Sequence, residues 1–273
     1  MSVLATYPSY LGELVECGLE AGYGPADFGL LRILLGGEIA TEGLKRRCRR
    51  LFGAVQLTET YGLTELVPFG ATECADGHLH FQPTNGLLEI HDLESPGAAA
   101  SEAPGSIVAT PFPPLREATP LLRYDTEDVV TPLSEPLDCP MRGLPATTAM
   151  LGKSALSVRH DRGWTFPREV VEALESVEVV PLPARYGFSA APGGVAVEVV
   201  ARSAGRRVSG EIEAALESRG VPVRRLLLCD SPGELRRPRP LRCDLKEGLA
   251  APRGASRAPD STVSPREPAF RAA

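Results

Sequence analysis

Lysine is nearly absent from this 273-residue chain. Of its 29 basic residues, only Lys45, Lys153 and Lys246 are lysines, and the others are arginines. A reaction that needs an amine side chain therefore has few candidates in the sequence. The chain is also short of positive charge as a whole, because 35 acidic residues leave a net charge of -6. Proteins that bind nucleic acid usually present a basic surface, so we expect no nucleic-acid partner.

Long apolar runs and clustered cysteines are missing as well. No stretch approaches the roughly 20 apolar residues of a membrane-spanning helix. The first residues, MSVLATYPSYLGELVE, lack the basic start and apolar core of a signal peptide. We therefore expect no membrane partner and a cytoplasmic location. The six cysteines are scattered without a CxxC pair, which favours free thiols in a reducing compartment over disulfides.

The first part of the chain, residues 1–75, alternates between helix and strand patterns. Residues 8–20 predict an amphipathic helix, and residues 30–38 (LLRILLGGE) predict a buried strand that two glycines end. Residues 41–53 predict a second helix, with a threonine cap at its start and a glycine just past its end. Residues 54–60 (AVQLTET) predict another strand. This order is typical of an α/β layer, in which ligands lie at the carboxyl ends of the strands.

Three further regions follow. Residues 76–151 carry short strand patterns, such as HLHFQP and GSIVATPF, between Gly, Pro and acidic turns, which is typical of a β-rich subdomain. Residues 152–247 combine a hairpin pattern, two helix patterns and several strands, and predict an α+β domain. Residues 248–273 are rich in Pro, Ala and Arg without periodicity, so we expect a disordered tail. The expected fold class is α/β plus α+β.

Six short segments carry glycines, hydroxyls and carboxylates in a recognisable order. They are ATYPSYLGELVE, ILLGGE, YGLTELVPFGATEC, TPLLRYDTEDVV, LGK and GWTFPREVVEALE. In order and spacing they resemble the adenylate-forming superfamily, and most closely its phenylacetate–CoA ligase branch. The resemblance implies a partial adenylate-forming fold, made of a truncated α/β subdomain, a β-rich subdomain and a C-terminal α+β domain of the mobile type. One such motif is weak evidence for a family, whereas six motifs in the expected order are strong evidence.

The resemblance implies an acyl-adenylate site. Adenine would lie against the ring of Tyr61 and the backbone of the GGE loop. The carboxylate of Asp128 would accept hydrogen bonds from the ribose hydroxyls. The residues to which the resemblance gives AMP contacts are Gly36, Gly37, Glu38, Tyr61, Asp128 and Lys153.

Catalytic groups and an acyl pocket are implied in the same way. Thr64 would contact the α-phosphate, and Glu65 would hold Mg²⁺, a hard cation that prefers oxygen ligands. Tyr7 and Tyr10 would help to form the acyl pocket. ATP or AMP, CoA and a small carboxylic acid are the ligands of the family. An acyl-adenylate or acyl-CoA is therefore the expected small-molecule partner.

The sequence departs from the family pattern at groups that drive adenylation. No Gly-rich Ser/Thr stretch ends in a lysine, so the phosphate-binding loop, and the N-terminal half that carries it, are missing from the match. Leu241 aligns with the family's C-terminal lysine, and only Lys246 is near enough to replace it. Asp125 and Glu127 add negative charge where the nucleotide would lie. We therefore expect impaired independent adenylation.

The resemblance also implies a zinc site, because many members of this branch carry one. The matching positions are Cys74, His80, Cys139 and Met141. A thioether binds zinc poorly, which leaves three ligands where structural zinc sites use four. We expect the other histidines to be solvated residues of strand edges and of a hairpin: His78, His91 and His160.

The resemblance leaves two functional hypotheses open. In the first, the chain is a truncated, degenerate ligase homologue that binds an acyl-adenylate, AMP or acyl-CoA. It would act in acid–thiol ligation or acyl transfer only with a partner that completes the site. In the second, the chain is a non-catalytic pseudoenzyme that binds a biosynthetic protein. The face that half of an α/β domain leaves uncovered predicts self-association or a protein partner.

Overall fold

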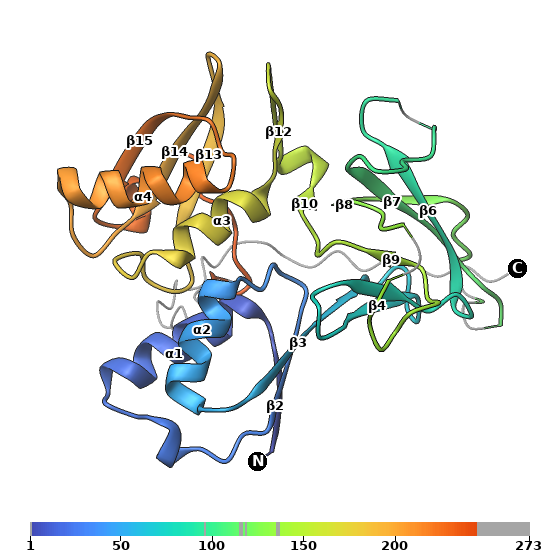
Figure 1. Cartoon of the computed structure of the whole chain (residues 1–273), viewed down its shortest axis with the longest axis horizontal. Helices are drawn as coiled ribbons and strands as arrows, with labels where there is room; N and C mark the ends of the chain where they lie inside the picture. The colour runs from blue at the N-terminus through green and yellow to red at the C-terminus, as the bar shows by residue number, and fades with distance from the viewer. Residues whose placement is uncertain (1, 96, 115–116, 118, 135–136, 245–273) are drawn as a thin grey trace, which may run out of the picture.

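The computed structural model describes residues 2–95, 97–114, 117, 119–134 and 137–244. The tail expected over 248–273 lies outside them. The described strands form sheets of six, four, two and three strands. Figure 1 shows α1, α2 and β2 at one end of the molecule, β4 and β6–β8 to the right, and α3, α4 and β13–β15 above the first group. This mixture of sheets and helices confirms the α/β plus α+β fold class.

The N-terminal elements form a parallel sheet covered by two helices. Strands β1 (Val3–Thr6), β2 (Arg32–Gly36) and β3 (Gln56–Gly62) run parallel, and helices α1 (Pro8–Glu20) and α2 (Glu42–Phe52) connect them. Apolar side chains of the helices and strands pack into one buried cluster, which includes Leu11, Val15, Ile33, Leu35 and Leu44. This packing brings the carboxyl ends of β2 and β3 to one edge of the sheet.

Helix α2 begins and ends where its sequence indicates. The hydroxyl of Thr41 accepts a hydrogen bond from the backbone N–H of Leu44 at 2.9 Å, which is the expected N-cap. Gly53 follows the helix with a φ of 79°, a conformation that favours glycine. Strand β3 extends past residue 60, because Tyr61 and Gly62 pair with the next strand.

The middle of the chain is made of antiparallel strands. Strands β4 (Gly70–Glu73), β5 (Leu79–Phe81) and β9 (Ala146–Thr147) continue the six-stranded sheet. Strands β6 (Gly86–Asp92), β7 (Gly105–Pro111), β8 (Tyr124–Val130) and β10 (Gly152–Lys153) form the four-stranded sheet. A core that includes Phe69, Phe81, Ile107 and Val130 packs the two sheets together. The strands expected in HLHFQP and GSIVATPF are β5 and β7.

The last part of the chain begins with the predicted hairpin, β11 (Val158–His160) and β12 (Gly163–Thr165). Helices α3 (Pro167–Ser176) and α4 (Arg206–Ser218) then pack against the sheet of β13 (Tyr186–Ala191), β14 (Gly194–Val200) and β15 (Val223–Cys229). Short 3-10 turns, η1 (Pro25–Asp27), η2 (Ser154–Leu156) and η3 (Pro232–Glu234), complete the set. Among the described helices, none combines the length and the apolarity that crossing a bilayer requires.

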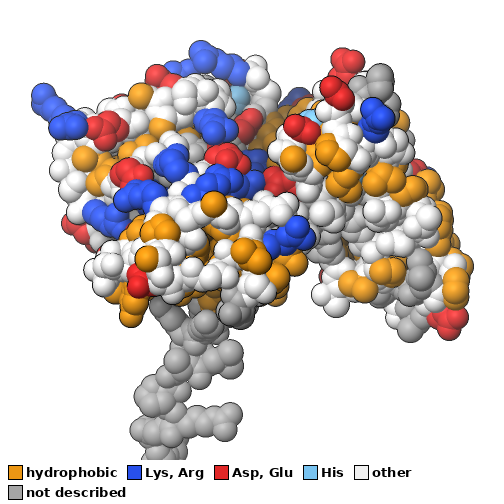
Figure 2. Space-filling model, turned by 60° about the horizontal axis from the view of Figure 1, so that its bottom comes forward, with side chains coloured by type: hydrophobic (Ala, Val, Ile, Leu, Met, Phe, Trp, Pro, Cys, Tyr) orange, Lys and Arg blue, Asp and Glu red, His pale blue; other side chains and the backbone are white. Residues whose placement is uncertain are grey.

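Several large apolar side chains around the N-terminal sheet are exposed. Strand β1 is the end strand of its sheet within the described residues, and Val3 on it is 48% exposed. Leu31, just before β2, is 68% exposed. Figure 2, which turns the bottom of Figure 1 toward the viewer, shows hydrophobic side chains gathered between charged ones.

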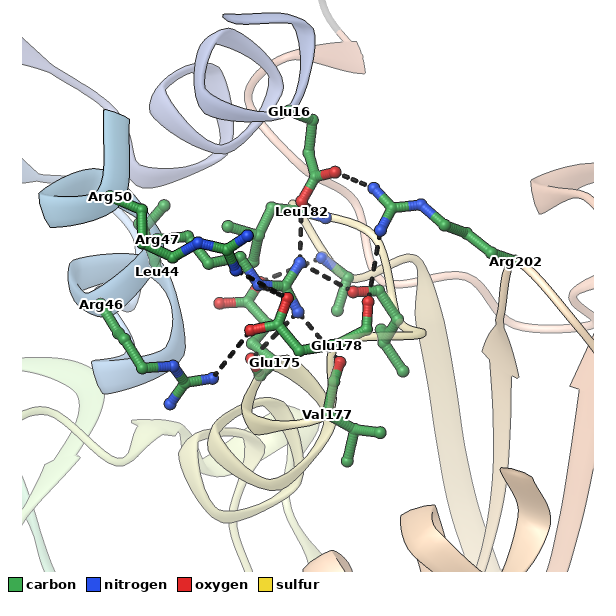
Figure 3. A network of polar contacts seen from close by, with 12 residues as sticks. Glu16, Leu44, Arg46, Arg47, Arg50, Glu175, Val177, Glu178, Leu182 and Arg202 are labelled. Atoms are coloured by element: carbon green, nitrogen blue, oxygen red, sulfur yellow. Dashed lines mark hydrogen bonds and ion pairs between the residues drawn. The ribbon is translucent and has the colours of Figure 1, made fainter. Parts of the chain in front are cut away.

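A buried arginine, Arg47, and a half-buried one, Arg168, join the N-terminal sheet to the C-terminal region. Arg47 of α2 donates to the carboxylate of Glu16 at 2.7 Å and to the carbonyl oxygens of Val180 and Val177 at 3.0 and 2.9 Å (Figure 3). Arg168 of α3 donates to both carboxylate oxygens of Glu59, on β3, at 2.9 and 3.1 Å. These contacts hold α3 and the following loop over the carboxyl ends of β2 and β3.

Candidate functional site

A cavity of about 470 Å³ lies where the N-terminal sheet, strands β8 and β10, and the C-terminal region meet. Its volume is in the range of small-molecule and cofactor sites. The polar and charged residues that line it come from all three regions: Ser9, Glu38, Glu59, Thr60, Tyr61, Asp128, Lys153, Glu175, Tyr186, Arg239 and Arg242.

Asp128 is held by the two neighbours that the sequence placed with it. The hydroxyl of Tyr61 donates to its Oδ2 at 3.2 Å, and Nζ of Lys153 donates to its Oδ1 at 3.0 Å. Burial raises the pKa of Asp128, while Lys153 and the Tyr61 hydrogen bond oppose that rise. Burial, above all, also raises the pKa of Tyr61, so its hydroxyl stays a donor. Each carboxylate oxygen of Asp128 keeps a lone pair for a further hydroxyl donor.

The GGE loop lies beside this group, and its glutamate has a structural contact that the sequence did not indicate. Gly37 and Glu38 line the cavity, whereas Gly36 ends β2 next to them. The Glu38 carboxylate accepts hydrogen bonds from the backbone N–H groups of Ser9 at 2.9 Å and Arg242 at 2.7 Å. Glu38 therefore ties the start of α1 to the C-terminal segment.

The two tyrosines expected at the acyl pocket lie next to each other. The rings of Tyr7 and Tyr10 have centroids 5.9 Å apart. A Cβ on Gly37 would lie 2.7 Å from Tyr7 Cε1, so glycine allows the loop to approach this ring. Neither tyrosine lines the cavity. Their role in an acyl pocket stays a prediction.

The residues expected near the phosphate lie outside the cavity lining. Thr64 and Glu65 are exposed in the turn after β3. Asp125 and Glu127 are also exposed and do not line the cavity, although the charge of Glu127 is among the influences that raise the pKa of Asp128, after burial. Leu241, aligned with the family lysine, does line the cavity. Lys246 lies outside the described residues.

A second group of side chains has the composition of a metal site. One donor atom from each of Cys74, His78, His80 and Cys139 lies within 4.8 Å of the other three. Cys139 Sγ and His80 Nε2 are 3.4 Å apart. Two cysteines and two histidines are a set that zinc binds tetrahedrally. His80 presents its Nε2 to the group, and the Nδ1 atoms of both histidines are buried without a hydrogen-bond partner among the described residues.

This arrangement corrects two expectations. The fourth member of the group is His78 and not Met141, and His78 is not a solvated strand-edge residue. The signal in the sequence was the spacing of CADGHLH, whose turn between β4 and β5 brings Cys74 and both histidines to one end of the strands. The other two histidines lie as expected, His91 on the end strand β6 and His160 in the hairpin.

Sequence reasoning missed the C-terminal contribution to the cavity. Tyr186 of β13, Arg239 and Arg242 all line it. The guanidinium of Arg242 lies over the Tyr7 ring, 5.5 Å from its centroid. No local pattern marks these residues, because arginine is frequent throughout the segment ELRRPRPLRC.

Comparisons with known proteins agree with this fold. The phenylacetate-coenzyme A ligase of Thermus thermophilus is 30% identical over 140 residues, which are 50% of this chain and 31% of that ligase. A 2-hydroxyisobutyryl-CoA ligase, solved in the postadenylation state in complex with 2-HIB-AMP, superposes with a TM-score of 0.69 at 17% identity, covering 91% of this chain and 57% of its own. The chain has an adenylate-forming ligase fold. No family model matches it.

Further ligases share this fold. An anthranilate CoA ligase in complex with anthranoyl-AMP has a TM-score of 0.63 at 11% identity, and covers 90% of this chain and 49% of its own. A benzoate CoA ligase from Burkholderia xenovorans has a TM-score of 0.62 at 16% identity, and covers 84% of this chain and 48% of its own. The chain thus spans about half the length of the adenylate-forming ligases that it resembles in structure. This coverage confirms the expected partial match.

Proposed function

We propose that the cavity binds the nucleotide part of an acyl-adenylate or AMP. The observation that carries this proposal is the group formed by Tyr61, Asp128 and Lys153 inside a cavity of nucleotide size. Asp128 offers the free lone pairs that ribose hydroxyls require, and Tyr61 offers a ring face. The solved ligases in complex with acyl-adenylates support the same assignment.

The reaction that suits such a ligand is acid–thiol ligation or acyl transfer, with CoA as the thiol. The groups that would hold the β- and γ-phosphates are not in the matched segments, so we propose that a partner completes the site. The chain's own residues would bind and orient the adenylate where the N-terminal sheet, strands β8 and β10, and the C-terminal region meet. Thr64 would contact the α-phosphate at the rim.

Glu65 is the candidate for the Mg²⁺ ligand. It is exposed in the turn after β3, and its charge is among the influences that raise the pKa of Tyr61, after burial and Asp128. One carboxylate together with phosphate oxygens suits Mg²⁺, which usually keeps several waters. When bound, the ion would neutralise phosphate charge.

Replacement of Asp128 by alanine tests the proposed nucleotide site. We expect Asp128→Ala to weaken AMP binding by about 1–3 kcal/mol, since it removes a charged hydrogen-bond acceptor. Glu65→Gln is the matched control, because metal-free AMP affinity does not depend on a magnesium ligand. Calorimetric titration of the purified chain with AMP, with no divalent metal present, measures both. Equal AMP affinities for wild type and Asp128→Ala would refute the site.

We also propose that Cys74, His78, His80 and Cys139 hold a structural zinc ion. The donor set is complete, and three of the four residues are buried. A four-ligand site without an open position stabilises a fold and performs no chemistry. Here it would join the β4–β5 turn to the loop before β9.

Metal analysis of variants tests the zinc proposal. Protein produced with zinc in the medium should carry about one zinc per chain by mass spectrometry. His78→Ala and Cys74→Ser should lose most of it, and Met141→Leu should keep it. Removal of zinc by a chelator should lower the melting temperature of the wild type, because binding and folding are coupled. Full zinc content in His78→Ala would show that the fourth ligand is another group.

A second candidate function is that of a non-catalytic binding partner. The exposed apolar residues Val3 and Leu31 at the end of the N-terminal sheet favour it, because open sheet edges and apolar patches commonly mark interfaces. The AMP titration separates the two candidates. A wild-type chain that binds no AMP at millimolar concentration would favour the partner function.

A further inference from the structure

Two buried donor groups on the C-terminal side of the cavity have no partner. Tyr186 is 1% exposed, and its hydroxyl makes no hydrogen bond within the described residues. The same is true of Nη1 of Arg239, and both residues line the cavity. Burial raises the pKa of the Tyr186 hydroxyl, and the charge of Arg239 and the approach of its side chain to the phenol oxygen oppose this rise. The two groups are neighbours, but they do not meet hydrogen-bond geometry, and the hydroxyl proton has no acceptor among the described residues. Buried polar groups without partners are rare and call for a ligand or water.

The backbone holds these two residues side by side. The N–H of Arg239 donates to the carbonyl oxygen of Tyr186 at 2.9 Å. A Cβ on Gly187 would overlap the carbonyl oxygen of Arg237, so glycine at this position lets the C-terminal segment cross β13 closely. Farther along, the N–H of Cys243 donates to the Ser9 hydroxyl at 3.2 Å. Together with the Glu38 contact, these bonds attach the segment at both sides of the cavity.

The acidic groups around the cavity already have partners. Asp128 is bound by Lys153 and Tyr61, Glu59 is bound by Arg168, and Glu38 accepts two backbone N–H groups. Glu175 accepts hydrogen bonds from Thr41 and from the backbone of Ala184. The guanidinium of Arg239 therefore has no acidic partner among these groups. A hydroxyl and a guanidinium that both donate require an acceptor that carries negative charge.

We propose that Tyr186 and Arg239 form an anion subsite that binds the phosphate of an adenylate in the cavity. The inference rests on the proposed nucleotide site and deepens it, because it adds contacts from the C-terminal side of the cavity to the phosphate that Thr64 would contact from the rim. It also assigns the positive charge on this side to an arginine of the C-terminal segment, in a chain whose expected lysine position is Leu241. A carboxylate offers the same acceptor chemistry, so the test includes one.

The test compares ligands with and without the anion. The probes are AMP, adenosine, inorganic phosphate and phenylacetate, each titrated by calorimetry into the full chain. We expect the wild type to bind AMP about 10- to 100-fold more tightly than adenosine, as hydrogen bonds to charged groups typically contribute. Arg239→Ala should remove most of this preference and leave adenosine affinity unchanged. Tyr186→Phe should reduce the preference by a smaller factor.

A matched control is available in the same segment. Arg237 is exposed, so Arg237→Ala should keep the AMP preference of the wild type. If AMP and adenosine bind the wild type equally, or if Arg239→Ala keeps the preference, the subsite is refuted while the nucleotide site stands. If the wild type binds inorganic phosphate but neither AMP nor adenosine, and Arg239→Ala no longer binds phosphate, the subsite stands while the proposed function fails. Phenylacetate binding that depends on Arg239, without any preference for AMP, would refute the phosphate assignment.

Discussion

Arg47→Met is expected to lower the free energy of unfolding by about 3–5 kcal/mol, the usual cost of removing one partner from a buried ion pair. The Arg47 side chain is 1% exposed, and it binds Glu16 and the carbonyl oxygens of Val177 and Val180 (Figure 3). Methionine retains much of the volume but none of the donors. The variant leaves a carboxylate, a buried carbonyl group and a half-buried one with fewer hydrogen bonds. Urea unfolding followed by circular dichroism measures the difference.

A neighbouring arginine provides the control for this effect. Arg49 lies on the same helix but is exposed, so Arg49→Met should change the free energy of unfolding by no more than about 0.5 kcal/mol. Both substitutions remove the same charge and have the same effect on helix propensity. A loss of less than about 1 kcal/mol in Arg47→Met would show that its contacts are replaced by water or by the second partner of Glu16, Arg202.

The second large effect is a pH dependence of stability through Glu175. Its carboxyl is fully buried, and burial raises its pKa from 4.5 to about 7 despite hydrogen bonds from Ala184 and Thr41. The folded state therefore holds a proton that the unfolded chain releases. The stabilising contribution is complete below pH 4.5 and is lost as pH rises through about 7. The two pKa values correspond to a loss of about 3 kcal/mol in the free energy of unfolding.

Glu175→Gln isolates this contribution, because glutamine has no proton to lose. Relative to wild type, the variant should be more stable at pH 8 than at pH 5, by about 2–2.5 kcal/mol, because at pH 5 the wild type has already lost part of the contribution. Burial also raises the pKa values of Glu59 and Glu169, and their effects cancel because both proteins retain them. Glu213→Gln, on the exposed side of α4, should follow the wild type at both pH values. If the free energy of unfolding of Glu175→Gln changed between pH 5 and pH 8 by as much as that of the wild type, the assignment to Glu175 would be contradicted.

The local elements and their order followed from the sequence. Helix α2 carries its own cap in Thr41 and its own stop in Gly53, and both act through bonds to residues a few positions away. The hairpin and the strands of the middle region are marked by glycine, proline and acidic turns. Such signals are local, so they are visible without the fold.

The site could be predicted only in part. Tyr61, Asp128 and Lys153 were expected together from the resemblance, and the structure brings them within hydrogen-bonding distance. The positions of Thr64 and Glu65 outside the cavity lining were not expected, because a motif does not show on which side of a turn a side chain lies. The predicted cysteine and histidine group was incomplete for a similar reason, since alignment pointed to Met141 whereas the β4–β5 turn supplies His78.

The sequence by itself determined the elements, their order and the residues of the Tyr61–Asp128–Lys153 group, because these depend on short-range patterns and on motifs of fixed spacing. The tertiary structure alone decided which of several similar side chains is buried. Arg46, Arg47, Arg49 and Arg50 are equivalent in the sequence KRRCRR, yet only Arg47 of these four is buried. Tyr186 and Arg239 likewise became a pair only when the C-terminal segment crossed β13. Burial and long-range pairing determine the charge and pKa of a side chain and whether its polar atoms find hydrogen-bond partners. Both arise from contacts between segments that are far apart in the chain.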